Sequence, residues 1–250
     1  MTRSIPLWLT LIAATGGADP IRSDTAVDLA VTGGATAFWA GSELLMNSLA
    51  PRSCRWCDRD LNGLDAGVRR ALVWQDTHTA GTLSDVGAFV LAPVAAFGLD
   101  ALAARHDGVA TDWLVIAEAV TLAGDLNQIV KLTVARERPS VHFGAKAAFS
   151  SEDNLSFYSG HTSLAFSLAV ASGTVASIRG YGLAPLVWGV GLGAAATTGY
   201  LRIAADRHYF TDVLTGAVVG SAVGLLVPLA FHRGSADAGG ASIASVRWVF

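Results

Sequence analysis

The sequence predicts an all-α protein, a bundle of about six helices that crosses a membrane several times. Hydrophobic residues make up 52% of the 250 residues and charged residues only 15%, whereas a soluble domain usually carries about 25% charge. Long apolar stretches recur along the chain, each near the roughly 20 residues that a helix needs to cross a bilayer. Strand-like alternation is scarce, which favours helices throughout.

The predicted helices cover residues 27–48, 84–104, 112–136, 161–178, 183–204 and 211–231. In the last stretch Gly216, Gly220 and Gly224 recur every four residues, a spacing that places a smooth stripe on one helix face and suits close helix packing. Two stretches contain polar groups that are costly in lipid, so we expect these to face the bundle interior or water. They are Glu43, Glu118, Asp125, Asn127 and Gln128.

The two ends of the chain differ from this helical domain, which we expect to span 27–232. Residues 1–18 resemble a secretory signal peptide with one Arg before an apolar run, and cleavage would fall near Ala18. The alternative is a short apolar lead-in to the first helix. The Gly/Ser/Ala-rich segment 233–250 is predicted to be a flexible tail.

The only two cysteines, Cys54 and Cys57, lie in a Cys-Arg-Trp-Cys sequence. This spacing fits a redox pair, half of a zinc site or a local disulfide. A four-ligand zinc site would need a second pair, and a redox pair would need a βαβ context. If the segment is exported, a local disulfide is favoured over free thiols.

Three polar motifs interrupt the apolar background, and the first ends in Arg138-Pro139. Lys131 and Arg138 are seven residues apart, so on a continuous helix their side chains would leave the same face. Pro139 should end the helix. Two cations at a helix end could bind a phosphate, although a basic helix end is also favoured by the macrodipole alone.

The second motif is Ser159-Gly160-His161, which leads into an apolar helix. Ser159 can cap that helix, and Gly160 allows the backbone to approach a ligand closely. The free N–H groups of a helix N-terminus favour an anion, and His161 in the first turn would lie beside it.

The third motif runs from Arg202 to Asp212. If the chain is helical from His208 onward, Asp212 lies at i+4 and faces it. A carboxylate on one ring nitrogen would make the other more nucleophilic. Arg202 offers a planar donor fork suited to phosphate. The alternative is a surface Asp–His pair that has no functional role and contributes little to stability.

Because the three motifs end the third predicted helix, begin the fourth and join the fifth to the sixth, an up-and-down bundle would bring them to one end. Together, Lys-x6-Arg-Pro, Ser-Gly-His and Arg-x5-His-x3-Asp resemble the type 2 phosphatidic acid phosphatase family, which shares its fold with vanadium haloperoxidases. The resemblance covers Lys131 to Asp212.

The resemblance implies a phosphatase with defined roles for these residues. Lys131, Arg138 and Arg202 would bind the phosphate oxygens, with Ser159 and the Gly160 N–H completing the cradle. His208 would attack phosphorus and form a phosphohistidine, Asp212 would orient His208, and His161 would protonate the leaving oxygen. Fixed cations would stabilise the transition state, so no metal and no cofactor are expected.

This chain departs from the family's usual pattern at two positions. Where the family often has Pro, this chain has Tyr158, which we expect at the substrate entrance, and Leu201 replaces a frequent Ser.

The implied substrate is a phosphorylated lipid such as phosphatidate or a polyprenyl diphosphate, and the implied location is a bacterial-type cell membrane with an extracytoplasmic site. A soluble periplasmic acid phosphatase is the alternative, and a vanadate-dependent haloperoxidase is a weaker one. A net charge of -3 without a basic tract argues against a nucleic-acid partner.

The distribution of positive charge conflicts with an extracytoplasmic site. The predicted site end holds eleven Lys and Arg residues and the opposite end of the mature chain five, and the positive-inside rule places the richer end in the cytoplasm. At least three of the eleven are candidates for phosphate binding, which biases the count.

Overall fold

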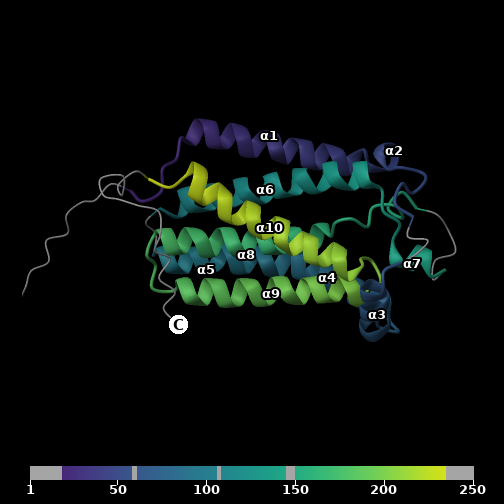
Figure 1. Cartoon of the computed structure of the whole chain (residues 1–250). Helices are drawn as coiled ribbons and strands as arrows, with labels where there is room; N and C mark the ends of the chain where they lie inside the picture. The colour runs from purple at the N-terminus through teal and green to yellow at the C-terminus, as the bar shows by residue number, and fades with distance from the viewer. Residues whose placement is uncertain (1–18, 58–60, 106–107, 145–149, 235–250) are drawn as a thin grey trace, which may run out of the picture.

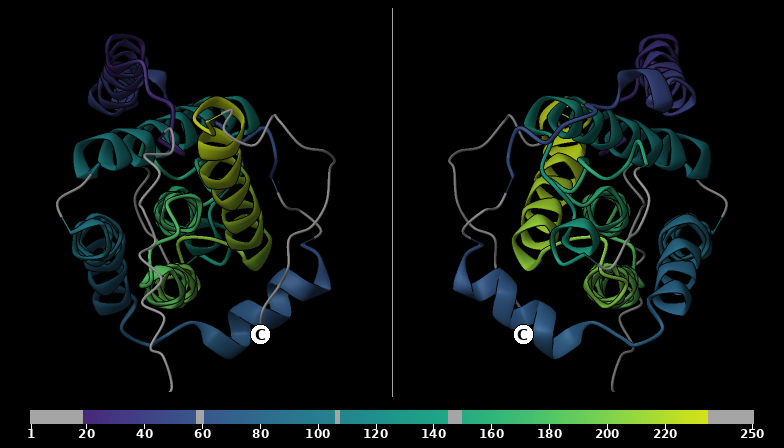
Figure 2. Two further views of the ribbon diagram at one scale, coloured as in Figure 1. Left: turned by 90° about the vertical axis from the view of Figure 1, so that its left-hand side faces the viewer. Right: turned by 90° about the vertical axis from the view of Figure 1, so that its right-hand side faces the viewer.

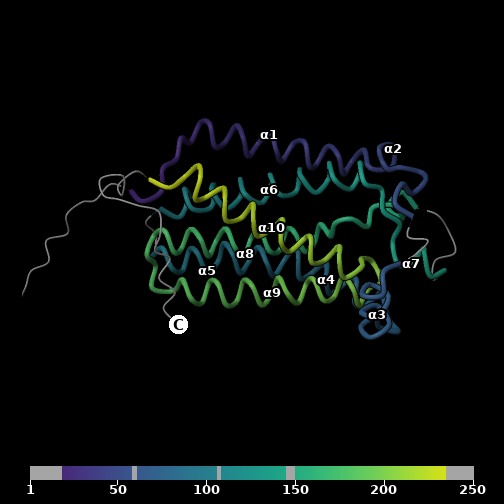
Figure 3. The backbone as a smooth tube through the Cα atoms, in the orientation of Figure 1, coloured from purple at the N-terminus to yellow at the C-terminus, as the bar shows by residue number. Residues whose placement is uncertain are grey.

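The structure, a computed structural model, describes residues 19–57, 61–105, 108–144 and 150–234. In this part of the chain the secondary structure is helical, with two isolated β-bridges and no strand. Six long helical segments lie side by side along one axis (Figures 1 and 3). They are α1 (Thr25–Leu44), a continuous run of α4 (Thr77–Val86), η1 (Gly87–Leu91) and α5 (Ala92–Ala104), α6 (Val109–Val134), α8 (Gly160–Ile178), α9 (Ala184–Ala204) and α10 (Phe210–Phe231). The predicted all-α bundle is therefore confirmed.

Helix α8 forms the centre of the bundle. It packs against α10, α9, α6 and α5, and the end-on views of Figure 2 show these helices around it. Ala165, Leu168 and Val175 belong to the core cluster that α8 shares with its neighbours. Because α8 is surrounded, apolar residues lie on every side of it and no residue from Thr162 to Ile178 is charged, as expected for a buried helix. Helix α1 lies outermost and packs on α6.

The glycine stripe has the predicted packing role. A Cβ added at Gly216 would lie 2.6 Å from the Ser159 carbonyl oxygen, and one at Gly224 would lie 2.7 Å from that of Ser167. A Cβ at Gly220 would meet the Ser163 carbonyl. The stripe thus lets α10 lie directly on the backbone of α8.

Helix α6 ends earlier than the sequence predicted. It stops at Val134, and Ala135 takes the left-handed conformation at φ 49°. Arg138 lies beyond this turn in extended backbone. The expectation that Lys131 and Arg138 share one helix face two turns apart is therefore wrong, because the helix ends between them.

Three further short helices lie between the long ones: α2 (Met46–Leu49), α3 (Gly63–Leu72) and α7 (Pro139–His142). Helix α3 begins where the Asn62 side chain accepts a hydrogen bond of 2.8 Å from the Asp65 N–H. Sequence reasoning missed α3 because its apolar content is too low to resemble the other helices. Helices α3 and α7 lie at one end of the bundle (Figure 1).

Polar groups inside the predicted spans mostly face the interior. Glu118, Asn127 and Gln128 are buried and Asp125 is half-buried. Glu43 is exposed, but its carboxylate accepts a hydrogen bond of 2.5 Å from Gln128.

The outer surface supports a membrane location. Three helical segments are long and apolar enough to cross a bilayer: Thr77–Ala104, Gly160–Ile178 and Phe210–Phe231. Large apolar side chains are exposed along the bundle, among them Val94, Leu102, Val218 and Leu226. The number of six spans stays a prediction.

The signal peptide predicted at 1–18, and all of the predicted tail except Arg233 and Gly234, lie outside the described residues.

Candidate active site

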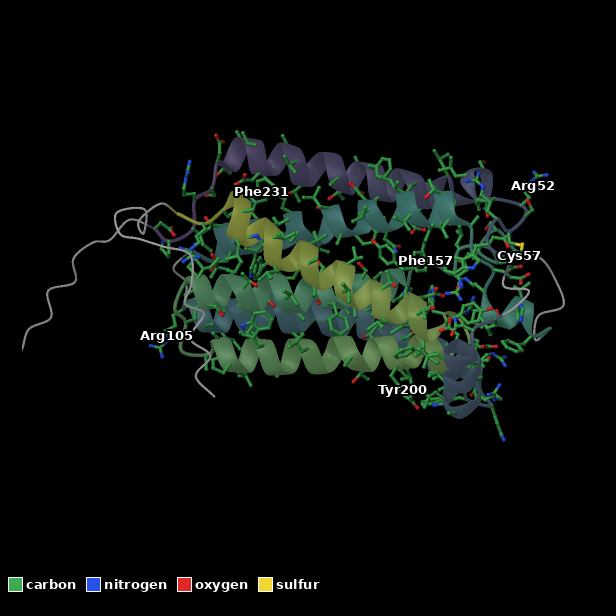
Figure 4. All side chains as sticks on the ribbon, viewed as in Figure 1. Arg52, Cys57, Arg105, Phe157, Tyr200 and Phe231 are labelled. Carbon is green, nitrogen blue, oxygen red and sulfur yellow. A yellow bond between two sulfur atoms is a disulfide. The ribbon has the colours of Figure 1, made fainter. Side chains whose placement is uncertain are left out.

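The three motifs meet at one end of the bundle, as predicted. They line a cavity of about 260 Å³ whose wall includes Lys131, Arg138, Gly160, His161, Arg202 and His208. Figure 4 shows nitrogen and oxygen atoms concentrated at this end, the end at which Cys57 and Phe157 are labelled. Of the eight residues proposed from the sequence, Ser159 and Asp212 do not line the cavity.

The N-terminus of α8 forms one wall. The helix begins at Gly160, so His161 lies in its first turn as predicted. A Cβ at Gly160 would lie 2.7 Å from Asn127 Oδ1 and 3.2 Å from Lys131 Nζ. Asn127 in turn donates a hydrogen bond of 2.8 Å to the Tyr158 carbonyl. Glycine is therefore required here so that α6 can place Lys131 beside the first N–H groups of α8, which favour an anion.

Ser159 acts as the N-cap of α8. Its hydroxyl is fully buried, lies 2.8 Å from the Thr162 hydroxyl and accepts a hydrogen bond of 3.4 Å from the Thr162 N–H. The predicted capping role is confirmed, whereas a direct hydrogen bond from this hydroxyl to phosphate does not fit the structure. Tyr158 is also buried, with 2% of its surface exposed, so the expectation that it lines the entrance is wrong.

Two arginines reach the cavity from different segments. Arg202, on α9, donates a hydrogen bond of 2.9 Å to the Ser84 hydroxyl and lies 3.3 Å from Asp85. Arg138 is held by its backbone N–H, which donates 2.8 Å to the Asp153 carbonyl, and its guanidinium lies 3.3 Å from Glu152. Each arginine is only 5% exposed, so both charges are concentrated in a small, poorly hydrated space.

His208 is held as a neutral imidazole. Its Nδ1 lies 2.7 Å from the Ser156 carbonyl oxygen. A carbonyl only accepts hydrogen bonds, so Nδ1 carries the proton and Nε2 keeps its lone pair. Burial, followed by the positive charges of Arg202, Arg138 and Lys131, holds the pKa of His208 well below its usual range. Burial and the neighbouring cations therefore both keep the imidazole in its neutral form at neutral pH.

Asp212 is not the direct partner of His208 that the sequence suggested. Helix α10 starts at Phe210, so His208 precedes it and the i+4 helical geometry does not apply. Asp212 Oδ2 is 3.9 Å from His208 Nδ1, beyond hydrogen-bond distance. The same oxygen accepts from the Ser156 hydroxyl at 2.6 Å and from the Tyr209 N–H at 3.0 Å. Asp212 therefore fixes the segment that carries the Ser156 carbonyl, and through it the ring of His208.

Arg136 is a central residue that sequence reasoning missed. It is completely buried, with Nη1 2.5 Å from Asp212 Oδ1 and Nη2 3.0 Å from Asp65 Oδ2. Its guanidinium also lies 4.3 Å from the centre of the Trp56 ring and 4.1 Å from that of Tyr209. The only sequence signal was its place two residues before Arg138, where it counted as one of the eleven Lys and Arg residues of the site end.

The loop that carries Trp56 is closed by a disulfide between Cys54 and Cys57. The local-disulfide alternative is therefore the one that the structure supports. Trp56 forms a β-bridge with Arg136, so this small loop is attached to the segment that leads into the site.

His161 has a carboxylate partner from another helix. Its Nε2 lies 2.8 Å from Asp85 Oδ1, and its ring packs edge-on against Phe89 at a centroid distance of 4.8 Å. Asp85 also faces Arg202, so one carboxylate links both groups. Asp85 was missed because it lies near the end of α4, more than 70 residues before His161 in the sequence.

An acidic side chain also faces the cavity. Glu152 lies between Arg138 and Arg207, at 3.3 Å and 3.8 Å, and is about half exposed. The Arg138 guanidinium holds the pKa of Glu152 below its usual value. This carboxylate occupies part of the cationic wall that an anionic ligand would use.

Comparisons with known proteins identify the family. Residues 112–235 match the model of the PAP2 superfamily. The helical fold and the cationic site with its two histidines are those of a phosphatase, and the segment 112–235, which carries all three motifs, belongs to the PAP2 superfamily. The structure is similar to that of a transmembrane PAP2-type phosphatidylglycerolphosphate phosphatase from Bacillus subtilis, with 18% identity and a TM-score of 0.49 over 80% of this chain and 93% of that chain. No curated protein matches the sequence.

Proposed function

We propose that this phosphatase hydrolyses a lipid phosphate or diphosphate, without a catalytic metal, through a phosphohistidine on His208. The observation that carries the proposal is the state of His208: its Nδ1–H is bound to the Ser156 carbonyl, and the neutral ring faces a wall of three cations. A neutral imidazole with one nitrogen fixed as donor is a competent nucleophile at the other nitrogen.

In the first step, His208 Nε2 attacks phosphorus, a P–N bond forms and the P–O bond to the leaving group breaks. His161 gives its proton to the leaving oxygen. Lys131, Arg138 and Arg202, with the first N–H groups of α8, hold the non-bridging oxygens and offset the charge of the transition state. In the second step, water attacks phosphorus, His161 takes its proton, and the P–N bond breaks to release phosphate.

A lipid substrate is favoured by the mixed lining of the cavity. Beside the cations, the wall contains Trp39 and Met46 from the α1–α2 region and Phe89 from η1. A phosphate next to an alkyl chain matches such a lining, and the apolar outer surface would bring lipid to it.

An extracytoplasmic position of the site is favoured by the disulfide at the same end of the molecule. Disulfides persist in oxidising compartments and are rare in the cytosol. Several of the positive charges at this end also have other roles, since Arg136 and Arg69 pair with buried carboxylates. The excess of Lys and Arg at the site end is therefore weak evidence for a cytoplasmic position.

The proposal is tested with phosphatidate and a polyprenyl diphosphate, each labelled with ³²P and incubated with purified protein in detergent. We expect phosphate release and an acid-labile, base-stable labelled protein, both lost in His208→Gln. The control is His78→Ala, because His78 is exposed and lies outside the cavity. Unchanged release by His208→Gln would refute the nucleophile, and no release from either lipid would refute the substrate class.

The role of His161 is tested with substrates that differ in their leaving group. An alkyl phosphate needs protonation of the leaving oxygen, whereas p-nitrophenyl phosphate releases a stable anion. His161→Ala should lower kcat by about 10²–10⁴ for the alkyl phosphate, the usual size of a general-acid contribution, and by much less for the aryl phosphate. An equal loss for both substrates would contradict the assignment.

A further inference from the structure

A second polar cluster lies at the opposite end of the bundle from the phosphate cavity. It consists of Asp28 in the first turn of α1, Glu118 in α6 and His232 directly after α10. Phe231, labelled in Figure 4, marks this end, and Figure 1 shows α1, α6 and α10 meeting there. One ligand atom from each residue lies within 4.8 Å of the other two.

All three side chains are more than nine-tenths buried, with exposed fractions of 6%, 6% and 3% for Asp28, Glu118 and His232. Within the described part of the chain, Asp28 Oδ2, Glu118 Oε2 and His232 Nε2 have no hydrogen-bond partner. His232 Nε2 and Glu118 Oε2 are 3.5 Å apart, which exceeds the usual 2.7–3.2 Å of an N–H···O bond. Burying such groups without a compensating partner is costly, which indicates that a cation belongs among them.

The second ring nitrogen of His232, Nδ1, has a partner of the kind that metal-binding histidines usually have. Its Nδ1 lies 3.0 Å from the Arg22 carbonyl oxygen, so Nδ1 carries the proton and Nε2 turns its lone pair toward the carboxylates. Histidines that bind metals usually donate their second N–H to a carbonyl or a carboxylate in this way. The backbone fixes the arrangement, because the Arg22 N–H donates 2.7 Å to the His232 carbonyl and Ile21 pairs with Arg233.

The spacing and the surroundings also fit a metal ion. Ligand atoms about 2.0–2.1 Å from Zn²⁺ in tetrahedral geometry lie about 3.3 Å apart, close to the 3.5 Å between His232 and Glu118. A cavity of about 640 Å³ adjoins all three residues and leaves room for water as a further ligand. Two carboxylates and one imidazole suit Zn²⁺ or Mn²⁺.

We propose that Asp28, Glu118 and His232 bind one divalent metal ion of this class, separate from the phosphatase chemistry. Helix α1 packs mainly on α6 and lies on the outside of the bundle. The ion would join α1 to both α6 and the end of α10, and so hold the outermost helix in place. The competing explanation is a protonated His232 that pairs with the two carboxylates.

The test uses protein purified in detergent without a histidine tag, stripped with a chelator, loaded with Zn²⁺ and dialysed. Metal analysis should give about one zinc per chain. The near-isosteric variant Glu118→Gln and the variant His232→Ala should lose most of it. His78→Ala and His208→Ala are the matched controls and should retain it, because these histidines lie at the other end of the bundle.

Two further measurements separate a metal from a protonated histidine. Co²⁺ loaded in place of Zn²⁺ should give a visible absorption spectrum that Glu118→Gln abolishes, and Zn²⁺ should raise the Tm of the wild type but not of Glu118→Gln. His232→Ala should retain phosphate release wherever it folds. A wild type that retains no metal after loading with Zn²⁺ or Mn²⁺ would overturn the proposal, as would equal uptake by Glu118→Gln and His232→Ala.

Discussion

At the scale of single residues, His208 and Arg136 show how buried charge shapes the site. His208 is neutral because burial and three neighbouring cations disfavour its charged form. Arg136 is stable in the interior because two carboxylates and two aromatic rings surround it. Removing one member of such a buried network leaves an uncompensated charge, which typically costs about 3–5 kcal/mol. The position of His208 therefore depends on residues such as Arg136 and Asp212 that do not line the cavity.

The lowered pKa of His208 leads to a prediction for the pH dependence of kcat/KM. Because its pKa is lowered, His208 stays neutral as the pH falls through about 6.5, the usual pKa of histidine. The loss of kcat/KM that comes from protonating His208 in the free enzyme should therefore occur below this pH. Lys131→Met removes one of the cations, so the pKa of His208 should rise and the acid limb should move to higher pH.

The measurement is the ratio of kcat/KM between variant and wild type at each pH, which cancels the ionisation of the substrate itself. Arg52→Gln is the control, since Arg52 is exposed at the same end but outside the cavity. A flat ratio for Lys131→Met would show that this cation does not set the ionisation of His208.

At the scale of elements, the contact between α8 and α10 decides how the site is assembled. The first turn of α8 carries Gly160 and His161, and the segment before α10 carries His208. The glycine stripe brings these two helix starts together without side chains between them. The periodicity of the glycines was visible in the sequence, but the partner helix was not, because periodicity describes only one face of one helix.

A single methyl group should disturb this contact. Gly220→Ala places a Cβ against the Ser163 backbone, with the Ser163 Cα at 2.9 Å, and overpacking of this kind typically costs about 1–3 kcal/mol. Gly193→Ala, in the exposed part of α9, has nothing within 4 Å and should be neutral or slightly stabilising, because alanine favours helix.

Thermal unfolding of the two variants in the same detergent gives the comparison. We expect a lower Tm and lower activity only for Gly220→Ala. Equal Tm values would mean that α8 and α10 do not pack as closely as the structure shows.

At the scale of the whole molecule, the bundle separates two polar ends by an apolar body. One end holds the phosphate cavity and the disulfide, and the other holds the Asp28–Glu118–His232 cluster (Figure 4). Both described ends of the chain, Asp19 and Gly234, lie near the second cluster, as their pairing through Pro20 and Ile21 requires. Helices that run up and down in this way present opposite ends to opposite sides of a membrane.

The orientation can be measured with single cysteines in a Cys54→Ser/Cys57→Ser background. Arg52 lies at the site end and Arg105 at the opposite end, as labelled in Figure 4. With an extracytoplasmic site, Arg52→Cys should react with a membrane-impermeant maleimide in intact cells, whereas Arg105→Cys should react only after permeabilisation. The reverse pattern would place the site in the cytoplasm, and labelling of both in intact cells would contradict a spanning bundle.

The six long helices and six of the residues that line the cavity were predictable from the sequence, whereas Arg136 and Asp85 were not. Apolar stretches of membrane-spanning length and the caps and breakers beside them are local features, so a single chain displays them. The three motifs at alternate helix ends also indicated, correctly, that they meet at one end of the bundle.

The tertiary structure alone decided which atoms face one another. It placed Arg138 beyond a left-handed turn at Ala135, gave His208 the Ser156 carbonyl instead of Asp212 as its partner, and brought Asp85 to His161. These pairings join residues that are distant in the sequence or separated by irregular backbone, where neither helical spacing nor composition fixes a direction. Contacts of this kind are set by the packing of whole helices, which is why the residues were predictable and their partners were not.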